Sequence, residues 1–276
     1  MFDIHLLRDD PSIFYSFAKE IYPPNNVGVS PTHAFLKLLQ DKNKLCTVYT
    51  QNIDGLELRA GVKKENLVQC HGSFATATCM KCNAKYTGDE IRDDIISGKV
   101  PYCQKCPPSS SDKQKNSRKR KFWSENNNDS NDDEQDDEED NPGVIKPDVT
   151  FFGEPLPSEF ADRLLGGDAE KCDLVICIGT SLKVAPVSEL IGIIPPSVPQ
   201  LYISKNPVHH IQFDVDMLGP CDQIIENLCR NCEWDLSYEN AQGEVIHSNP
   251  SSGNADWEQV GASTHRLKEG KSSCLD

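Results

Sequence analysis

Long hydrophobic runs are missing from this sequence of 276 residues. No window approaches the roughly 20 apolar residues that a membrane-spanning helix requires. The first four residues are followed by charged side chains rather than by the apolar stretch of a secretory signal. Sequence repeats at the periods of solenoids or propellers are missing as well. We therefore expect an intracellular protein that has no membrane partner.

A basic surface is also missing, because 43 acidic residues outnumber 28 basic ones and the formal net charge is -15. The charge is uneven, since residues 130–140 are almost wholly acidic and residues 113–121 almost wholly basic. Residues 116–121 suit a nuclear localisation signal or a nucleic-acid contact, but an ordinary solvated loop has the same composition. Residues 109–141 hold almost no aliphatic side chain, so we expect them to form a disordered insertion.

Two proline-led segments near the beginning of the chain predict helices. Asp10-Pro11 offers a cap and a proline in the first turn, and apolar residues recur at helical spacing as far as Ile21. Ser30-Pro31 repeats the pattern at the start of a second segment with its own apolar stripe. These segments predict a small helical module.

Three short apolar runs predict strands of a parallel sheet. They cover residues 45–50, 174–178 and 200–203, and each is followed at once by polar or turn-forming residues. We expect a Rossmann-like α/β fold with helices on both faces of the sheet and a smaller domain beside it. Ligands bind at the carboxyl ends of the strands in such folds, where these polar residues lie.

The pairing of cysteines predicts a metal site. Cys79-x-x-Cys82 and Cys103-x-x-Cys106 are separated by 20 residues, the arrangement of two knuckles that close one tetrahedral zinc site. Four thiolates leave no open position for water, so the zinc would be structural; four unrelated buried thiols are the alternative. A third pair, Cys229-x-x-Cys232, has no matching pair nearby, and we interpret it as ordinary thiols at a helix end.

Single motifs elsewhere are weak, but their order along the chain is specific. Residues 50–55 read T-Q-N-I-D-G and residues 70–73 read C-H-G-S; the first alone could be turn chemistry and the histidine a structural one. The two cysteine pairs follow, and then K-P-x-x-x-F-F-G-E and G-T-S. This order resembles that of the class I sirtuins, most closely the nuclear sirtuin-1 type. The resemblance covers residues 1–234 apart from the insertion.

The resemblance implies an NAD-dependent protein lysine deacetylase that transfers acetyl from acetyl-lysine to ADP-ribose and releases nicotinamide. NAD and zinc would be its cofactors, and acetylated proteins, among them histones and nuclear regulators, its partners. It also implies a nuclear protein, with cytoplasmic occurrence left open. Two other classes compete: a catalytically silent module that binds acetylated peptide, and a zinc-ribbon nucleic-acid binder. A zinc-ribbon nucleic-acid binder would need a basic face around the cysteines, which this sequence lacks, so no direct contact with nucleic acid is expected.

The same resemblance implies roles for individual residues. His71 would be the general base, and Asn52 and Asp54 would act beside it in catalysis. Cofactor contacts would come from Gln51, Asn52, Ile53, Asp54, Gly179, Thr180, Ser181, Ser204, Lys205 and Cys221. The acetylated peptide would pair with the segment formed by Thr150, Phe151, Phe152, Gly153 and Glu154, where threonine replaces the family's usual valine. Cys79, Cys82, Cys103 and Cys106 would bind zinc.

Sirtuins carry a glycine-rich segment, G-A-G-x-S with a later G-I-P-D-F-R-S, ahead of the region that opens this chain. Since that segment normally cradles the pyrophosphate of NAD, we expect weak NAD binding and little turnover from the chain as it stands. The predicted organisation is a helical module at 1–33, a Rossmann-like domain in two parts at 34–73 and 149–236, a zinc module at 74–148 with the insertion at about 109–141, and a flexible tail at 237–276.

Overall fold

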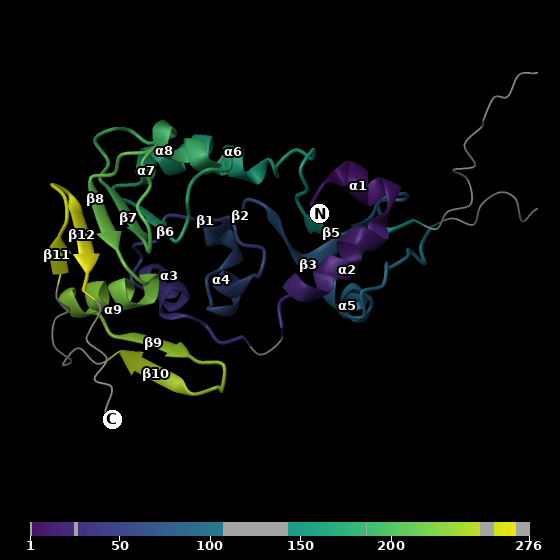
Figure 1. Cartoon of the computed structure of the whole chain (residues 1–276), viewed down its shortest axis with the longest axis horizontal. Helices are drawn as coiled ribbons and strands as arrows, with labels where there is room; N and C mark the ends of the chain where they lie inside the picture. The colour runs from purple at the N-terminus through teal and green to yellow at the C-terminus, as the bar shows by residue number, and fades with distance from the viewer. Residues whose placement is uncertain (1, 25–26, 107–142, 186, 249–256, 269–276) are drawn as a thin grey trace, which may run out of the picture. The chain divides into compact units, whose positions relative to one another are not determined.

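The computed structural model describes residues 2–24, 27–106, 143–185, 187–248 and 257–268 (Figure 1). The predicted insertion at 109–141 and its basic cluster at 116–121 lie outside the described residues. The chain divides into two compact units, each built from two separate stretches. Unit 1 comprises residues 1–22 and 74–153, and unit 2 comprises residues 23–73 and 154–276.

Unit 1 combines three helices with a small sheet. Its elements are α1 (Ile4–Asp9), α2 (Pro11–Ile21), α5 (Gly88–Ile96), β3 (Gly72–Cys79, which begins in unit 2), β4 (Lys85–Thr87) and β5 (Ile145–Val149). The strands form one sheet in the order β4-β3-β5. Asp10 caps α2 through the backbone N–H of Ser12, with Pro11 in the first turn, which confirms the first predicted helix.

An aromatic cluster forms much of the core of unit 1. The ring centroids of Phe2, Phe14 and Phe151 lie between 4.9 and 5.7 Å apart, and Phe14 and Phe151 are each only 1% exposed. Burial of such large rings stabilises the unit through apolar area and through their tilted, edge-on packing. The residues before α1 and after β5 are therefore joined to α2 by the packing of these rings, and to each other by a backbone hydrogen bond from Phe152 to Phe2.

Unit 2 is built on a five-stranded sheet in the order β11-β12-β8-β7-β6. The strands are β6 (Val175–Ile178), β7 (Gln200–Ser204), β8 (Val215–Leu218), β11 (Trp257–Gln259) and β12 (Thr264–Leu267). Neighbours pair in parallel from β12 to β6, and β11 pairs antiparallel with β12. This confirms the predicted strands at 174–178 and 200–203 and the α/β fold with a parallel sheet.

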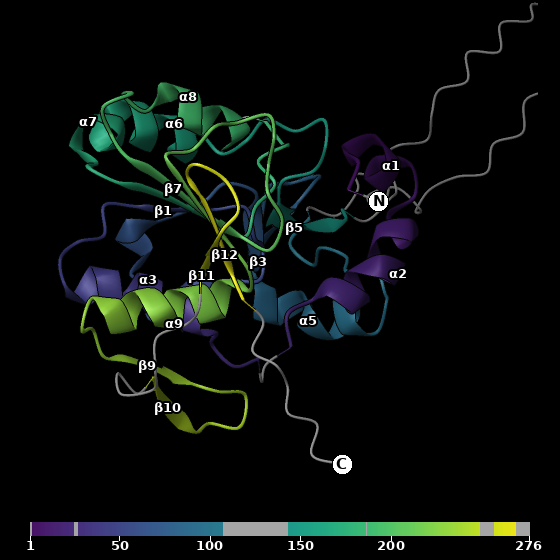
Figure 2. The ribbon, with the colours of Figure 1, turned by 60° about the vertical axis from the view of Figure 1, so that its left-hand side comes forward.

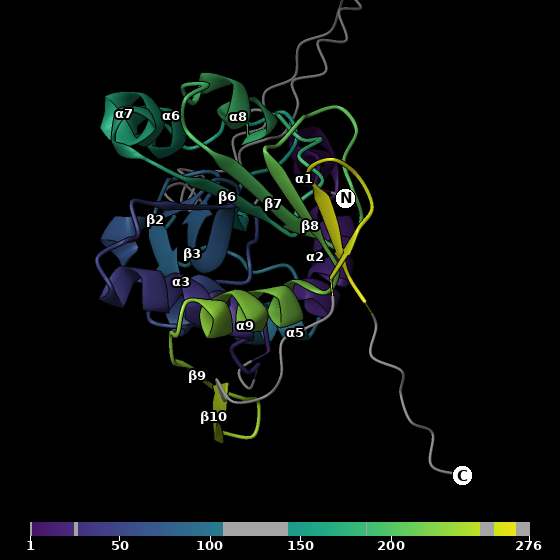
Figure 3. The ribbon, with the colours of Figure 1, turned by 90° about the vertical axis from the view of Figure 1, so that its left-hand side faces the viewer.

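Helices cover both faces of this sheet (Figures 2 and 3). On one face lie α3 (Pro31–Asp41) and α9 (Cys221–Asn231); near the other lie α6 (Glu159–Arg163), the π-helical turn η3 (Leu164–Asp168), α7 (Ala169–Lys171), the 3-10 turn η4 (Val187–Glu189) and α8 (Leu190–Ile193). Successive residues of β7 point to opposite faces: Ile203 packs in the cluster with α3 and α9, while Tyr202 packs in the cluster with α8. Both faces of the central strands are therefore buried, as parallel sheets require.

A second, separate pair of parallel strands carries the predicted strand at 45–50. β1 (Val48–Thr50) pairs with β2 (Leu67–Gln69), and among the described residues neither pairs with β6. Between them in the chain lie α4 (Leu56–Arg59) and the 3-10 turn η1 (Lys64–Asn66). The single sheet that we predicted is thus divided in two. Tyr49 and Val175 nevertheless pack against one shared apolar cluster with α6 and α8.

Two further predictions differ from the structure. α3 packs its buried Phe35 against α9 in unit 2, so the predicted helical module at 1–33 is replaced by a boundary after residue 22. The predicted flexible tail at 237–276 contains β9 (Leu236–Glu239), β10 (Val245–Ser248), β11 and β12 among its described residues. Long-range pairing supplies the order that local composition did not indicate. In the described ranges no helix has the length and apolar character needed to cross a bilayer.

Candidate functional site

The ends of β1 and β2 bring His71 next to Gln51. The backbone N–H of Cys70 donates to the carbonyl of Thr50 at 2.9 Å, which extends the ladder by one bond. The next residue, His71, places Nδ1 3.0 Å from the carbonyl oxygen of Gln51. Because a carbonyl oxygen can only accept, Nδ1 carries the proton, and Nε2 of the neutral ring is left as an acceptor. The His71 ring is therefore held with one unprotonated nitrogen.

The turn between β1 and α4 is closed by the side chain of Asp54, one residue before the N-cap Gly55. The Asp54 carboxylate accepts from the backbone N–H of Leu56 at 3.1 Å, and Gly55 adopts a φ of 72°. The backbone N–H of Asn52 donates to the Thr50 hydroxyl at 3.1 Å, while the Asn52 side chain is exposed. The turn uses only the backbone of Asn52 and leaves its side-chain amide exposed. Asn52 can therefore belong to the turn and also bind a ligand.

A hydrogen-bonded chain links this turn to the loop after β6. The Thr180 hydroxyl donates to Oε1 of Gln51 at 2.7 Å and accepts from the backbone N–H of Leu182 at 3.1 Å. The side chain of Gln51 is thereby held against one loop while its backbone oxygen holds His71. Gln51, His71 and Thr180, which were predicted from separate motifs, form one network in unit 2.

Further predicted cofactor residues gather at the carboxyl ends of β6 and β7. The backbone N–H of Gly179 donates to the carbonyl of Ile203 at 2.9 Å, and the Cys221 thiol reaches the same oxygen at 3.7 Å. Burial raises the pKa of the Cys221 thiol, so this group stays protonated and able to donate. Ser204 closes β7, and its carbonyl accepts from Gly219 at 3.0 Å. Lys205, directly after it, is exposed.

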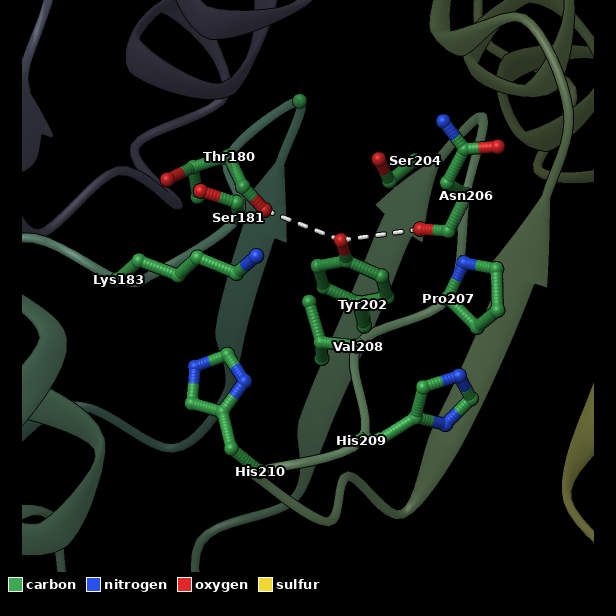
Figure 4. A pocket seen from close by; sticks show the side chains of 11 residues that line it. Thr180, Ser181, Lys183, Tyr202, Ser204, Asn206, Pro207, Val208, His209 and His210 are labelled. Atoms are coloured by element: carbon green, nitrogen blue, oxygen red, sulfur yellow. Dashed lines mark hydrogen bonds between the residues drawn. The ribbon is translucent and has the colours of Figure 1, made fainter.

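A cavity of about 640 Å³ opens at these strand ends (Figure 4). Three predicted cofactor residues after β6, together with Ser204, form part of its wall. The remaining lining residues are Lys183, Tyr202, Asn206, Pro207, Val208, His209 and His210. Sequence reasoning missed these seven, although the polar residues after the strand at 200–203 indicated the right edge of the sheet. Gly179 has a φ of 66°, which favours glycine. Because glycine has no side chain, a ligand can approach its backbone closely.

The predicted peptide-binding segment divides into buried and exposed parts. Phe151 is 1% exposed and packs in the aromatic core of unit 1, whereas Phe152 is 71% exposed. The backbone of Phe152 is already paired, because its N–H donates to Phe2 at 2.8 Å and its carbonyl accepts from Ile4 at 3.1 Å. The ring of Phe151 is therefore part of the core and does not form a peptide-binding surface. Thr150 is half-buried.

The four predicted metal ligands come together in unit 1. Cys79, Cys82, Cys103 and Cys106 have their sulfur atoms within 4.8 Å of one another, and the Cys79–Cys106 and Cys82–Cys103 separations are both 3.6 Å. Zinc–sulfur bonds of about 2.3 Å in a tetrahedron place sulfur atoms about 3.8 Å apart, which matches this cluster. Backbone N–H groups also donate to sulfur, from Lys81 to Cys79 at 3.4 Å and from Lys105 to Cys103 at 3.3 Å. The donor set fits zinc.

Tyr86, on β4, supports the cluster from outside. Its hydroxyl lies 3.0 Å from Sγ of Cys103, and the ammonium of Lys105 lies 3.9 Å from the centre of its ring. Burial alone raises the pKa of the Cys103 thiol, but the donors around it, Tyr86 and the Lys105 N–H first among them, outweigh burial and lower it to about 6. A thiolate at Cys103 is thus favoured before metal is considered. No sequence pattern pointed to Tyr86.

The third cysteine pair stands apart from any metal cluster in the described part of the chain. Cys229 is fully buried in α9, and burial raises the pKa of its thiol to about 12. Cys232 is exposed at the end of that helix. The pair therefore behaves as predicted, as ordinary thiols at a helix end.

Comparison with known proteins identifies relatives over most of the chain. The Sir2 family profile matches residues 1–186. The NAD-dependent histone deacetylase sir2 of Schizosaccharomyces pombe is 49% identical over 237 residues, 85% of this chain and 49% of that protein. The NAD-dependent protein deacetylase HST1 of Saccharomyces cerevisiae is 42% identical over 242 residues, 88% of this chain and 47% of that protein.

An animal relative matches to a similar degree. The NAD-dependent histone deacetylase sirtuin-1 of Drosophila melanogaster is 42% identical over 229 residues, 83% of this chain and 26% of that protein. The chain thus spans about half or less of the length of these curated relatives. With a family profile that covers most of its residues and with these relatives, the chain belongs to the Sir2 family, the sirtuins.

Proposed function

We propose that this chain is the core of an NAD-dependent protein lysine deacetylase, which moves the acetyl group of acetyl-lysine to ADP-ribose and releases nicotinamide. One observation carries the proposal: His71 donates from Nδ1 to the carbonyl of Gln51, which leaves Nε2 of the neutral ring unprotonated and able to accept a proton. The fungal and insect relatives, which are all named as NAD-dependent deacetylases, support the same reaction.

His71 would take the proton from a ribose hydroxyl at Nε2, since imidazole is the side chain most often used as a general base. Its bond to a backbone carbonyl holds the ring and its tautomer fixed, so little orientational freedom is lost when a substrate arrives. Gln51 bonds to His71 through its backbone carbonyl and to Thr180 through its side chain. A displacement of the Thr180 loop would therefore also displace the His71 ring. Asn52 and Asp54 would orient the ribose and the carboxamide by hydrogen bonding.

The residues around Gly179 suit the adenosine half of NAD. When bound, NAD supplies the ribose to which the acetyl group moves. Gly179 permits close approach of the backbone, and Thr180, Ser181 and Ser204 contribute hydroxyl groups at the carboxyl ends of two parallel strands. Cys221 and Lys205 would border the same ligand.

Zinc would be held by the four thiolates of unit 1, which fill its coordination and leave no position for substrate. Its role would be to stabilise a small three-stranded unit rather than to activate water. The segment of residues 150–154 would meet the acetylated peptide. Gly153 has a φ of 92°, and a Cβ there would lie 2.9 Å from Ile4, so a glycine is required at that point of the segment.

The decisive test is mass-spectrometric detection of nicotinamide and O-acetyl-ADP-ribose after incubation with NAD, zinc-loaded protein and an acetyl-lysine histone peptide. Since little turnover is expected from the chain as it stands, we expect slow but measurable product formation by the chain and none above background by His71→Ala. His33→Ala is the matched control, because His33 also lies in unit 2 and its ring bonds to the cap residue Ser30, away from Gln51 in the described network. Equal product from His71→Ala and the parent chain would refute the role of His71.

A binding module without turnover is the alternative. Its mark would be binding of the acetylated peptide, measured by fluorescence anisotropy, with no release of nicotinamide.

Action on histones and a nuclear location would follow from the relatives' names. Replacement of residues 118–121 by alanine in a fluorescent fusion tests the location, since unchanged nuclear accumulation would exclude this cluster as the import signal.

A further inference from the structure

The cavity at the ends of β6 and β7 has a charge opposite to that of the whole chain. Lys183, His209 and His210 line it, and none of the eleven lining residues in the described chain is acidic. The chain as a whole has a formal charge of -15. A cavity lined by basic groups in an acidic protein favours an anionic ligand, because the local field and the donors both select for negative charge.

The connection of the two strands resembles a dinucleotide-binding unit. β6 ends at a glycine turn, the helical segments η4 and α8 follow, and β7 returns parallel to β6. In such units an acidic residue about 20 positions after the turn binds the ribose 2′-hydroxyl of NAD, whereas a basic residue accommodates a 2′-phosphate. Here Ser204 lies 204 minus 179, that is 25, positions after Gly179, and Lys205 and Asn206 follow it. The expected carboxylate is replaced by a hydroxyl, an ammonium and an amide.

Three hydrogen bonds fix the groups that would meet such a phosphate, and the two from Tyr202 are drawn in Figure 4. The Tyr202 hydroxyl lies 3.0 Å from the carbonyl of Thr180 and 3.2 Å from that of Asn206, so it ties the two loops together across the cavity. His210 lies with Nε2 2.9 Å from the carbonyl of Leu182. Because that oxygen accepts, Nε2 carries a proton, and Nδ1 becomes a second donor, able to bond a phosphate oxygen, when the ring is protonated to imidazolium.

The position of Lys183 is fixed by the buried residue before it, Leu182. Leu182 is 4% exposed and holds a φ of 48°, an unusual value for a branched residue, so its backbone is set by its surroundings. Lys183 follows directly and is exposed, and in Figure 4 its ammonium points toward the Tyr202 hydroxyl. The charge of Lys183 is thus directed into the cavity.

We propose that this cavity receives the 2′-phosphate of a 2′-phosphorylated adenine dinucleotide, with Lys183, Asn206 and the two histidines as its contacts. The proposal rests on the proposed function in one respect, that the Gly179 loop binds the adenosine half of a dinucleotide. It adds that NADP-class nucleotides enter the NAD site and compete there, because no carboxylate repels the extra phosphate. One charge-assisted hydrogen bond to that phosphate tightens binding by about tenfold or more.

The test is isothermal titration of the zinc-loaded chain with two pairs of ligands. Adenosine 2′,5′-bisphosphate and adenosine 3′,5′-bisphosphate carry the same charge and differ only in the position of one phosphate. ADP-ribose and its 2′-phosphate differ only in the presence of that group. We expect the 2′,5′ isomer to bind about tenfold tighter than the 3′,5′ isomer, and the phosphorylated ADP-ribose to bind at least as tightly as the plain one.

Three variants separate the cavity from general attraction of anions. Asn206→Glu restores a carboxylate at the end of β7 and should abolish the preference for the 2′-phosphate, while ADP-ribose still binds. Lys183→Ala should reduce the preference, whereas Lys171→Ala, an exposed lysine on α7 outside the cavity, should leave it unchanged. Thermal unfolding of each variant checks that it is folded.

The outcomes are distinguishable. Equal affinity for the two bisphosphate isomers, with ADP-ribose still bound, overturns the 2′-phosphate proposal and leaves the cofactor assignment standing. Failure of every adenine nucleotide to bind overturns both. An equal loss in Lys183→Ala and Lys171→Ala would show attraction to net charge and also overturn the proposal.

Discussion

Replacement of Gly143 by alanine tests the zinc site at its tightest point. A Cβ on Gly143 would lie 2.5 Å from Sγ of Cys79, 2.8 Å from Sγ of Cys106 and 2.9 Å from Cβ of Lys81. The backbone around it has little room to move, because the Gly143 carbonyl accepts from Cys103 at 2.8 Å and the next carbonyl, that of Val144, accepts from Met80 at 2.8 Å. Gly143 thus packs directly against one cysteine of each pair, Cys79 and Cys106.

The expected cost follows from this crowding. One added methyl group in a well-packed site costs about 1–3 kcal/mol. Since two of the three contacts are to sulfur atoms, relief of the clash must spread the thiolates, and the cost falls mainly on metal affinity. Each tenfold change in affinity corresponds to about 1.4 kcal/mol, so zinc should bind roughly 5- to 150-fold more weakly. Structural zinc contributes about 10–16 kcal/mol, so the variant should still load zinc when no chelator is present.

The assay is competition between protein and a chromogenic zinc chelator, with the metal content of both proteins first measured by mass spectrometry. Gly192→Ala is the control, because nothing lies within 4 Å of a Cβ there and the residue is in α8. Its zinc affinity should be unchanged, and its free energy of unfolding unchanged or raised by about 0.5–1 kcal/mol. An unaltered zinc affinity in Gly143→Ala would refute the reasoning.

Three other variants test separate parts of the structure. Tyr86→Phe removes the hydroxyl 3.0 Å from Cys103 and should speed zinc release to a chelator several-fold, while Tyr102→Phe, whose side chain is exposed, should not. Asp168→Asn should lower the free energy of unfolding by about 1–3 kcal/mol near neutral pH, because its carboxylate accepts from Tyr49 at 2.7 Å. Burial raises the pKa of Asp168, but hydrogen bonds from Thr47 and Tyr49 and the charge of Arg163 outweigh it, so the net shift is downward. The difference between the two proteins should therefore begin to shrink as pH falls below about 4 and be lost once pH falls through the lowered pKa of the folded protein. A urea titration at several pH values decides this, and a difference that persists in acid would contradict it. Phe151→Ala should cost about 3–5 kcal/mol in the same assay and Phe152→Ala less than about 0.5, and equal costs would count against the burial assigned to them.

Local signals predicted the elements whose cause is local. The cap and proline at Asp10-Pro11 and Ser30-Pro31 begin α2 and α3, and the apolar runs at 174–178 and 200–203 become β6 and β7. The cysteine spacing predicted the four ligands because two knuckles are each formed by a few neighbouring residues. In these cases the physics that forms the element lies within one short stretch of sequence.

Features that depend on distant partners were not predicted. β12 has only four residues with a mixed polar pattern, and it becomes a strand because β8, almost 50 residues earlier, offers a parallel partner. Lys183 and His210 line one cavity because β6 and β7 are neighbours in the sheet. The pairing of Phe2 and Ile4 with Phe152 likewise closes a loop of about 150 residues. No pattern within a short window contains that information.

β12 also determines where the chain can be shortened. It pairs with one edge of β8 while β7 occupies the other, and Leu267 is 7% exposed beside Ile224 in the cluster under α9. A chain ended soon after Trp234 would leave β8 with a row of free backbone donors and acceptors next to apolar side chains. Such edges pair with other copies, so the shortened protein should aggregate, whereas one that retains residue 268 should stay monodisperse.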